Sequence, residues 1–347
     1  MFQQMESNGT QRLHFFSDPE TGLKAIIAIH STVRGPAIGG CRFISYQQED
    51  NAVIDALRLA RGMSYKAALA GLPHGGGKAV IIKPENHFNR PALFQAFGRF
   101  VNTLNGDYIT AMDSGTQVSD MDQINKTTNW VTCTNSIGDP SPMTALGVFE
   151  GIKAAVRFKL GRHSLNGIHI SLQGLGHVGY EVARLLHQTG AKLTVADINQ
   201  ERALLCEKNF SAQVVEPDDI YAIDADLFCP CGLGAIINDQ TIDQFKVSMI
   251  AGSANNQLAE EHHGEILAQK GILYAPDFLI NAGGLIFVAL QYSAQPQAAI
   301  RSKVMQISDA LKNLFQESSM TGIAVNRIAN KKAEEIISAA ESMNSAA

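Results

Sequence analysis

Apolar and polar residues alternate along the chain in short blocks that predict strands and helices in turn. In the first part, apolar runs over residues 13–16 and 23–30 predict two strands joined by a turn. Apolar positions on one helical face predict helices over residues 51–63 and 89–104. A further strand is predicted from residue 108, running into a turn by residue 116. This alternation is typical of an α/β fold.

The second part of the chain continues the alternation after a turn-forming motif, Gly-Asp-Pro-Ser-Pro at residues 138–142, which we interpret as a domain junction. Helices are predicted over residues 143–160, 307–315 and 331–343. Between them, short apolar runs predict the strands of a doubly wound parallel sheet. These runs cover residues 168–172, 192–196, 213–215, 227–228, 247–251 and 272–274.

One βαβ unit of this second part carries a glycine motif. The strand over residues 168–172 leads directly into Gly174-x-Gly176-x-x-Gly179, a helix, and a second strand that ends in Asp197. In this context the motif predicts a dinucleotide site, because the glycines let the backbone approach a pyrophosphate at the helix N-terminus. Asp197 is expected to bind the ribose hydroxyls, which favours NAD over NADP. The alternative is a glycine-rich turn in an unrelated α/β protein.

A second glycine cluster separates two lysines in residues 61–83. Lys66 ends a helix-patterned segment, and Lys78 follows Gly75-Gly76-Gly77 and opens an apolar strand-like run. Two ammonium groups facing one pocket repel, so the more buried one is expected to lose its proton more easily and to act as a base. A phosphate-binding loop is excluded because the motif lacks its first glycine and its final Ser or Thr. A plain turn with a surface lysine remains an alternative.

Two more segments carry candidate chemistry. Asp113 lies at the end of the strand predicted from residue 108, where sites are usually built in α/β folds, although an isolated aspartate at this position favours a turn cap. Residues 34–42 are predicted to form a loop around Gly39 and Gly40. The pair His262-His263 lacks the HExxH spacing of a zinc site, so we interpret it as a solvated helix end and predict no metal.

Length, composition and charge narrow the class of protein. The 347 residues suggest two domains, and 45% hydrophobic with 18% charged residues fits a globular chain. A net charge of −5 gives no basic footprint for nucleic acid. The five cysteines do not have the spacing of a disulfide framework, and the two in Cys229-Pro-Cys231 are interpreted as buried packing residues. With no secretion signal and no apolar stretch long enough to span a bilayer, we expect a soluble cytoplasmic protein.

Several motifs, in their order and spacing, resemble the glutamate/leucine/phenylalanine/valine dehydrogenase family, and within it most closely the leucine dehydrogenases. The resemblance covers about residues 22–336. The motifs are GPAIGGCR, RGMSYKAALAGLPHGGGKAVI, YITAMDSGT, DPSPMTALGV, GLGHVG, AGSANNQL and APDFLINAGG. It implies a substrate and oligomerisation domain over residues 1–140, a Rossmann domain over residues 141–324, and a cleft between them. The helix near residues 325–347 is expected to pack back on the first domain.

The resemblance also implies a reaction and roles for named residues. The reaction is the reversible NAD-dependent oxidative deamination of an L-amino acid to a 2-oxo acid and ammonia, in a homo-oligomer, dimer or octamer. Lys66 binds the substrate carboxylate, Lys78 activates water, and Asp113 shuttles protons. The other substrate-binding residues are Gly39, Gly40, Ile38, Ala111, Asn256, Asn281, Leu285 and Val288. The cofactor-binding residues are Gly174, Leu175, Gly176, His177, Val178, Gly179, Asp197, Thr144, Ala254 and Asn255.

The side-chain pocket implied by the family is apolar and contains no cation for a glutamate carboxylate, which favours leucine, valine or isoleucine. Phenylalanine stays open, because one methylene changes discrimination by only about 1–3 kcal/mol. Met112 and Phe287 depart from the residues usual in leucine dehydrogenases and leave the substrate range in doubt. A non-catalytic NAD-binding regulator and a hydroxy acid dehydrogenase also stay open, and His74 is the nearby candidate for the chemistry of the latter.

Overall fold

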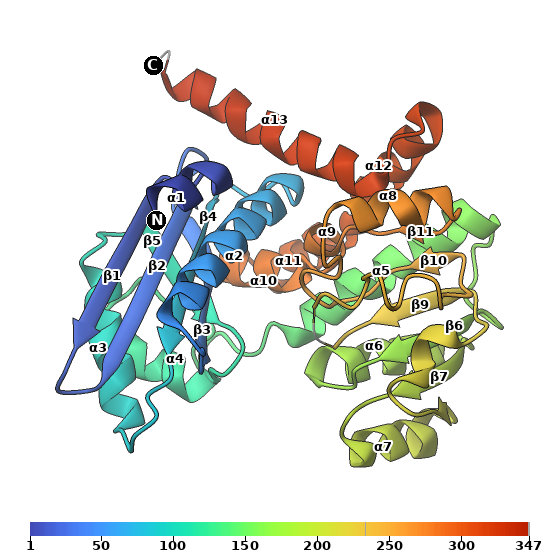
Figure 1. Cartoon of the computed structure of the whole chain (residues 1–347), viewed down its shortest axis with the longest axis horizontal. Coiled ribbons are helices and arrows are strands. Elements are labelled where there is room, and N and C mark those ends of the chain that lie inside the picture. Colours follow the sequence, from blue (N-terminus) through green and yellow to red (C-terminus); the bar gives the residue numbers. More distant parts are fainter. Residues whose placement is uncertain (233, 346–347) are drawn as a thin grey trace. The chain divides into compact units, whose positions relative to one another are not determined.

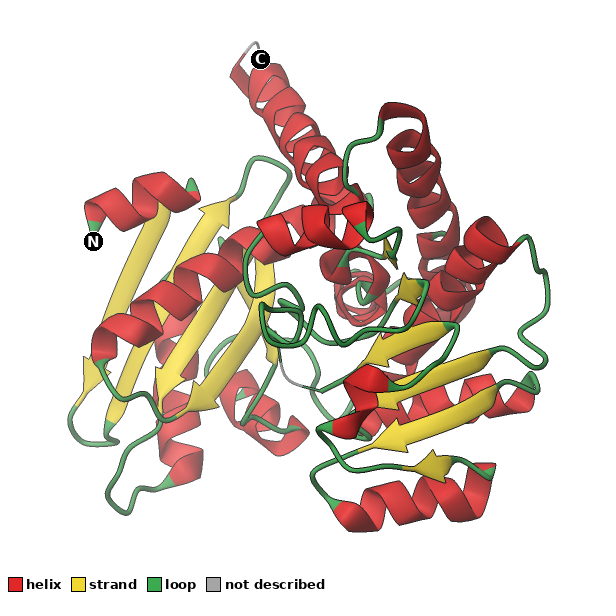
Figure 2. Cartoon of the chain, turned by 45° about the vertical axis from the view of Figure 1, so that its right-hand side comes forward, coloured by secondary structure: helices red, strands yellow, loops and turns green. Residues whose placement is uncertain are grey.

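The computed structural model describes residues 1–232 and 234–345, and the chain divides into two compact units. The first unit comprises Met1–Pro140, Val288–Gln295 and Ala333–Ala347, and the second comprises Ser141–Phe287 and Pro296–Lys332. Each unit contains one β-sheet flanked by helices (Figures 1 and 2). The α/β fold predicted from the alternation of strands and helices is therefore confirmed.

The first unit is built on a five-stranded sheet in the order β1-β2-β4-β3-β5. Its strands are β1 Arg12–Asp18, β2 Leu23–Ser31, β3 Ala37–Ile44, β4 Gly75–Ile82 and β5 Tyr108–Met112. Pairing is antiparallel from β1 through β2 to β4, and parallel from β4 through β3 to β5. The two predicted N-terminal strands are confirmed as the β1–β2 hairpin. Every strand but β1 is largely buried, which places β4 and β3 in the middle of the unit.

Two helices cover opposite faces of this sheet. Helix α2 (Glu49–Leu69) packs Ala56 and Leu57 against Ile26 of β2 and Val80 of β4. Helix α3 (Arg90–Asn102) lies on the other face, where the Phe94 ring meets that of Phe43 edge to face. Because strand side chains alternate between faces, the apolar pattern fixes which helix each strand residue meets. Figure 2 shows the long α2 in front of the sheet.

Two glycine-rich segments differ from the prediction. Residues 37–44, expected as a loop, form the buried strand β3, and Gly75 to Gly77, expected as a turn, begin strand β4. The reason is close packing: a Cβ on Gly39 would lie 1.8 Å from the Gly77 carbonyl oxygen, and one on Gly76 would lie 2.0 Å from the Ser64 nitrogen. Glycine is required there by the approach of neighbouring backbones, while local propensity alone disfavours strand.

The second unit has a six-stranded parallel sheet in the order β11-β10-β9-β6-β7-β8. Its strands are β6 His169–Gln173, β7 Lys192–Ala196, β8 Gln213–Val214, β9 Leu227–Pro230, β10 Met249–Ile250 and β11 Leu273–Tyr274. This is the predicted doubly wound order, with the chain running outward from β6 in both directions. Its core includes Phe228, Ile237, Ile250 and Leu267.

The remaining helices complete both units. They are α1 Phe2–Asn8, α4 Val118–Asn125, α5 Ser141–Leu160, α6 His177–Gln188, α7 Gln200–Phe210, the 3-10 turn η1 Asp219–Ala222, α8 His262–Gln269, α9 Asp277–Ile280, α10 Gly283–Tyr292, α11 Gln297–Met305, α12 Ile307–Thr321 and α13 Val325–Ser345. The end of α13 belongs to the first unit, where Glu334 accepts a hydrogen bond from Tyr65. None of the described helices combines the length and hydropathy needed to cross a bilayer. All five cysteines are free thiols, and Cys231 is only partly buried, unlike Cys229.

Candidate active site

Lys78 and Asp113 form an ion pair inside the first unit. Lys78 is the fourth residue of β4, and Asp113 follows the last residue of β5. Only 7% of the Lys78 side chain and 16% of the Asp113 side chain are exposed. Lys78 is thus inside a strand and not at its mouth, and the alternative of a surface lysine on a turn is wrong. A buried ion pair of this kind is a candidate functional site.

Arg42 adds a second cation to this pair. Its Nε lies 3.5 Å from Asp113 Oδ2, while its Nη1 bonds Asp55 Oδ2 at 2.8 Å. Burial opposes ionisation of Asp113, but attraction by Lys78 and then Arg42, with hydrogen bonds from Lys78 and the Ser114 backbone, outweighs it and lowers the pKa of Asp113 to about 2. Asp113 is therefore a carboxylate throughout the neutral range and serves the ion pair.

The turn after β5 holds Asp113 in place through its backbone. The Asp113 N–H donates to Thr116 Oγ1 at 2.8 Å, and the Thr116 hydroxyl donates to the Asp113 carbonyl at 2.7 Å. Gly115 has φ +82° and lies against Phe43, where a Cβ would meet the Phe43 carbonyl at 1.8 Å. The Asp113 side chain faces Lys78 and Arg42 and also accepts a hydrogen bond from the Ser114 backbone, so it does more than cap the turn.

The predicted substrate residues of β3 and β5 lie side by side in this sheet. Gly39 pairs with Thr110, and Gly40 pairs with Ala111. A Cβ on Gly40 would lie 2.7 Å from the Asp113 Cβ, so glycine lets the strand reach the carboxylate. Ile38, which pairs with Gly76 of β4, is fully buried in the core. The structure brings this group together with Lys78 on neighbouring strands.

Lys66 lies in the last turn of α2, which packs along β4. The helix comes closest at Gly76, where only hydrogen fits beside Ser64. Lys66 is partly buried. Both lysines of the predicted pair therefore belong to the same unit, one on a helix and one on the strand under it.

A separate cavity of about 370 Å³ lies in the second unit at the glycine motif. It is lined by Gly176, His177, Val178, Gly179, Arg202, Cys231, Gly232, Ser253, Ala254 and Asn255. The three motif glycines differ in their surroundings. Gly174 has φ +89°, a Cβ on Gly179 would lie 1.9 Å from the Gly174 carbonyl oxygen, and a Cβ on Gly176 would meet nothing within 4 Å. Gly176 thus leaves open space above the N-terminus of α6, as a pyrophosphate cradle requires.

Asp197 fixes the loop that leads into this cavity. Its carboxylate accepts the Leu175 N–H at 2.5 Å and the Asn199 N–H at 2.7 Å. These bonds join the end of β7 to the loop after β6, at the carboxyl edge of the sheet where dinucleotides bind. Each carboxylate oxygen can accept a second hydrogen bond, so the geometry still suits ribose hydroxyls.

The amide residues predicted near the substrate lie in loops of the second unit. Asn281 donates from Nδ2 to the Ser253 carbonyl at 3.0 Å and to Asn255 Oδ1 at 2.8 Å, and its own Oδ1 is buried with no hydrogen-bond partner among the described residues. Asn256 adopts φ +51°, a left-handed conformation that asparagine tolerates. Thr144 lies in the first turn of α5, and a Cβ on Gly283 would lie 3.1 Å from its Cα. An orphaned buried oxygen beside the cavity is a feature of a ligand site.

Helix α10 is divided between the two units after Phe287. Leu285, Phe287 and Val288 are buried on it, with 6%, 5% and 4% exposure. Leu285 belongs to the second unit and Val288 to the first. Phe287 and Met112 are the two residues that depart from the family pattern. Met112 is the last residue of β5, directly before Asp113.

Sequence reasoning missed several residues that support these sites. Arg42 could have been found from the strand alternation after Gly40, had residues 37–44 been recognised as a strand. Tyr108 is buried and donates its hydroxyl to the Gly39 carbonyl at 2.7 Å, which no sequence pattern signals. Arg202 and Ser253 line the cavity only through the fold.

His74, the candidate residue of a hydroxy acid dehydrogenase, has a structural partner. Its Nδ1 lies 3.2 Å from the Pro36 carbonyl oxygen. Burial lowers the pKa of the His74 imidazole, and the hydrogen bond to Pro36 only partly offsets this effect. The ring therefore holds the loop before β3 in place, and no carboxylate contacts it among the described residues.

Comparisons with family models place both halves of the chain in one group. Residues 10–130 match "Glu/Leu/Phe/Val dehydrogenase, dimerisation domain", and residues 194–345 match "Glutamate/Leucine/Phenylalanine/Valine dehydrogenase". These matches contain Lys66, Lys78 and Asp113 in the first segment, and Asp197 and Asn281 in the second.

Individual relatives cover almost the whole chain. A leucine dehydrogenase of Thermoactinomyces intermedius is 49% identical over 341 residues, 97% of this chain and 93% of its own. A phenylalanine dehydrogenase of Bacillus thermotolerans is 44% identical over 98% of this chain and 91% of its own. Among solved structures, the L-tryptophan dehydrogenase of Nostoc punctiforme superposes with a TM-score of 0.84 at 42% identity, covering 98% of this chain and 99% of that one.

Proposed function

Because the chain belongs to the Glu/Leu/Phe/Val dehydrogenase family and is an amino acid dehydrogenase, we propose that it catalyses the reversible oxidative deamination of a branched-chain L-amino acid. Leucine is the preferred substrate in this proposal, with valine and isoleucine also accepted. The products are the 2-oxo acid and ammonia. The observation that carries the proposal is the buried Lys78–Asp113 pair, because a mere NAD-binding regulator has no use for it.

The residues of the first unit are assigned to acid–base work and substrate binding. Lys66 binds the substrate carboxylate, and Lys78 is the base that activates water for attack on the imine carbon. Asp113 passes protons to and from the amino group. The direct ion pair supports this division, because it holds the Asp113 carboxylate in contact with the Lys78 amine. Gly39 and Gly40 are assigned to substrate binding by the family resemblance, and Gly40 lets β3 approach the Asp113 side chain.

The nicotinamide cofactor is proposed to be NAD. When bound, it accepts the hydride from the substrate α-carbon. The open space at Gly176 and the start of α6 suit its pyrophosphate, and Asp197 suits the ribose hydroxyls while repelling a 2′-phosphate. Thr144, Ala254, Asn255 and Asn281 are proposed to orient the nicotinamide end. Asp197→Ala is expected to reduce the preference for NAD over NADP. An unchanged ratio of the kcat/KM value with NAD to that with NADP would contradict the assignment of Asp197 to the ribose hydroxyls.

Substrate choice is proposed to rest on Ile38, Ala111, Leu285 and Val288. All four side chains are apolar and buried, and a glutamate side-chain carboxylate among them would be desolvated without a partner. This reasoning favours an aliphatic amino acid over glutamate. Asn256 is assigned to the substrate together with Asn281. A homo-oligomer, dimer or octamer, and a cytoplasmic location complete the proposal.

The test is a panel of substrates under one set of conditions. NAD reduction is measured with leucine, valine, isoleucine, phenylalanine, tryptophan and glutamate, and the best substrate is repeated with NADP. We expect the highest kcat/KM for leucine, and each methylene lost or gained to change it by about 10–200-fold at most. A higher kcat/KM for phenylalanine or tryptophan than for leucine would replace the branched-chain assignment with an aromatic one. No turnover of any amino acid would overturn the proposal that the protein is an amino acid dehydrogenase.

A further inference from the structure

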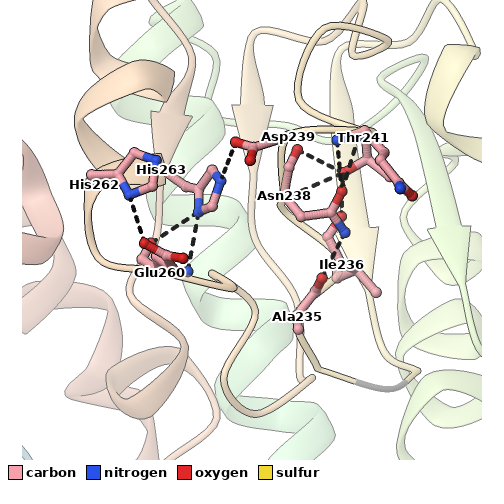
Figure 3. A network of polar contacts seen from close by, with 9 residues as sticks. Ala235, Ile236, Asn238, Asp239, Thr241, Glu260, His262 and His263 are labelled. Carbon is pink, nitrogen blue, oxygen red and sulfur yellow. Dashed lines mark hydrogen bonds and ion pairs between the residues drawn. The ribbon is translucent and has the colours of Figure 1, made fainter.

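A second cluster of ligand-type side chains lies in the second unit and takes no part in the proposed reaction. It consists of Asp239, His262 and His263, each of which offers one ligand atom, and these atoms all lie within 4.8 Å of one another. Asp239 comes from the loop after β9, and the two histidines begin helix α8 (Figure 3). His263 Nε2 is 3.0 Å from Asp239 Oδ1.

The burial of His263 corrects the prediction from sequence. Only 3% of its side chain is exposed, so it is not part of a solvated helix end, although 45% of His262 and 86% of Asp239 are exposed. The two imidazole rings lie with their centroids 4.2 Å apart and their planes tilted by 31°. The buried His263 imidazole is fixed, whereas the exposed His262 and Asp239 side chains can change rotamer. A metal ion can therefore be coordinated by all three through side-chain rotations alone.

The backbone of Glu260 holds the Nδ1 side of the His263 ring, so Nε2 is the nitrogen that faces Asp239. His263 Nδ1 lies 3.1 Å from both the N–H and the carbonyl oxygen of Glu260. In the tautomer with Nδ1 protonated, the ring donates to that carbonyl, and Nε2 can bind a metal ion in place of its hydrogen bond to Asp239. A histidine held through one nitrogen by a backbone carbonyl is the usual outer support of a metal ligand.

The neighbouring charges favour a cation. The Glu260 carboxylate contacts His262 Nδ1 at 3.3 Å. Glu261 and Glu265 are close in sequence, but both are ion-paired with Arg327 and are already neutralised. The N-terminus of α8 opposes a cation by its dipole, an effect of about 0.3–1 kcal/mol that is small beside coordination by a carboxylate and two imidazoles.

We propose that Asp239, His262 and His263 form a site for a divalent transition metal of the zinc class, with water completing the coordination. Two imidazoles and one carboxylate are a donor set that suits Zn²⁺, Co²⁺ and Ni²⁺ better than Mg²⁺ or Ca²⁺, which prefer oxygen ligands. The ligand nitrogen atoms bind as neutral imidazoles, so binding releases any proton that they carry.

The proposed metal site lies on the same pair of loops as the cofactor cavity, so metal binding is expected to stabilise the cavity. The loop after β9 and the loop after β10 pair with each other: Ala235 donates to Asn256, Ile237 donates to Gln257, and Ala259 donates to Ile237. At one end of this paired segment Gly232 and Asn255 line the cavity. At the other end stand Asp239 and the two histidines. A metal ion there ties the two loops together and stabilises that wall of the cavity.

The experiment uses the full chain, freed of metal by a chelator, and titrates it with ZnCl2 by calorimetry. We expect one saturable equivalent and a rise in Tm, with Co²⁺ giving the visible absorption of a low-symmetry site. His262→Asn and Asp239→Asn remove exposed ligands, so neither threatens the fold, and each is expected to weaken zinc binding at least about tenfold. His163→Asn, an exposed histidine outside the cluster, is the matched control and is expected to bind as the parent does.

The possible results decide the proposal. A loss of affinity in both ligand variants with an unchanged control supports it. Equal affinity in all three variants, or binding that does not saturate, overturns it. Activity toward amino acids is measured separately and does not enter this decision, so the metal site and the proposed reaction fail or hold independently.

Discussion

The two candidate sites of this chain are built in opposite ways. In the first unit, the chemistry rests on charged side chains, Lys78, Asp113 and Arg42, that strands bring together inside a sheet. In the second unit, the cavity is formed mainly by backbone, with glycines and a helix N-terminus as its central features. A side-chain site is sensitive to charge and protonation, whereas a backbone site is sensitive to the space that a Cβ would fill.

Glycine itself illustrates the difference. Gly39 lies in a buried strand and has no room for a Cβ because of the Gly77 carbonyl, while Gly176 borders open space. The first glycine serves packing, and the second is proposed to make room for a ligand. Substitution of Gly39 should therefore change mainly stability, and substitution of Gly176 should change mainly cofactor binding. Substitution of the charged pair should change turnover more than either.

The largest effect is expected for Lys78→Ala. Removing a general base costs about 10²–10⁴-fold in turnover, and the cavity of the second unit keeps its own residues, so binding of NAD is expected to persist. The measurements are kcat with leucine and NAD affinity by fluorescence titration. Lys83→Ala, at the residue just after β4, is the control that should keep its activity. If Lys78→Ala retains most of its turnover, another group is the base.

The next effect concerns packing. Gly39→Ala is expected to destabilise the first unit by about 1–3 kcal/mol, because the new methyl forces β3 away from β4. Thermal unfolding measures this change. Gly62→Ala, in the interior of α2 with nothing within 4 Å, should instead raise stability by up to about 1 kcal/mol. An unchanged Tm for Gly39→Ala would show that the strands separate more easily than their packing implies.

Acid conditions test the charges of the first unit. The pKa of Asp113 is about 2 in the folded protein against 3.8 ordinarily, which corresponds to about 2 kcal/mol of stability. Because the folded pKa is lowered, this contribution is fully present above about pH 4 and is lost as the pH falls toward 2. Urea midpoints at pH 6 and pH 3 measure it. Asp113→Asn should lose less stability between these pH values than the parent, whereas the exposed Asp218→Asn should match the parent.

The smallest effect is expected for Gly176→Ala. Its methyl occupies open space, so the Tm should stay within about 1 °C of the parent, since uncrowded substitutions change stability by no more than about 0.5 kcal/mol. The cofactor, however, must approach the backbone there, and its KM is expected to rise about tenfold. Steady-state kinetics with varied NAD and a thermal melt check both. A lower Tm with an unchanged KM for NAD would show that Gly176, like Gly39, serves packing and not cofactor binding.

Sequence patterning predicted much of this molecule because its strongest signals are local. The strand–glycine–helix–strand–Asp197 unit appears in the structure as predicted, since each of its parts is a short-range feature of the chain. The helices α2, α3 and α5 followed from apolar spacing. The short helices α1 and α4 were missed because they bury few residues.

The two strands that were mistaken for loop and turn share one physical cause. Gly39, Gly40 and the Gly75–Gly77 cluster disfavour strand by local preference, and only the approach of neighbouring backbones makes glycine the required residue inside β3 and β4. Long-range contacts of this kind leave no trace in a window of sequence.

By itself, then, the sequence determined the family and the alternating fold, and it predicted which lysine and aspartate carry the chemistry. Only the tertiary structure placed Lys78 within a strand, set Arg42 behind Asp113, buried Tyr108 against Gly39, and joined Asp239 to His262 and His263. The reason is that charge pairing and side-chain burial depend on distances between residues far apart along the chain, which folding alone fixes.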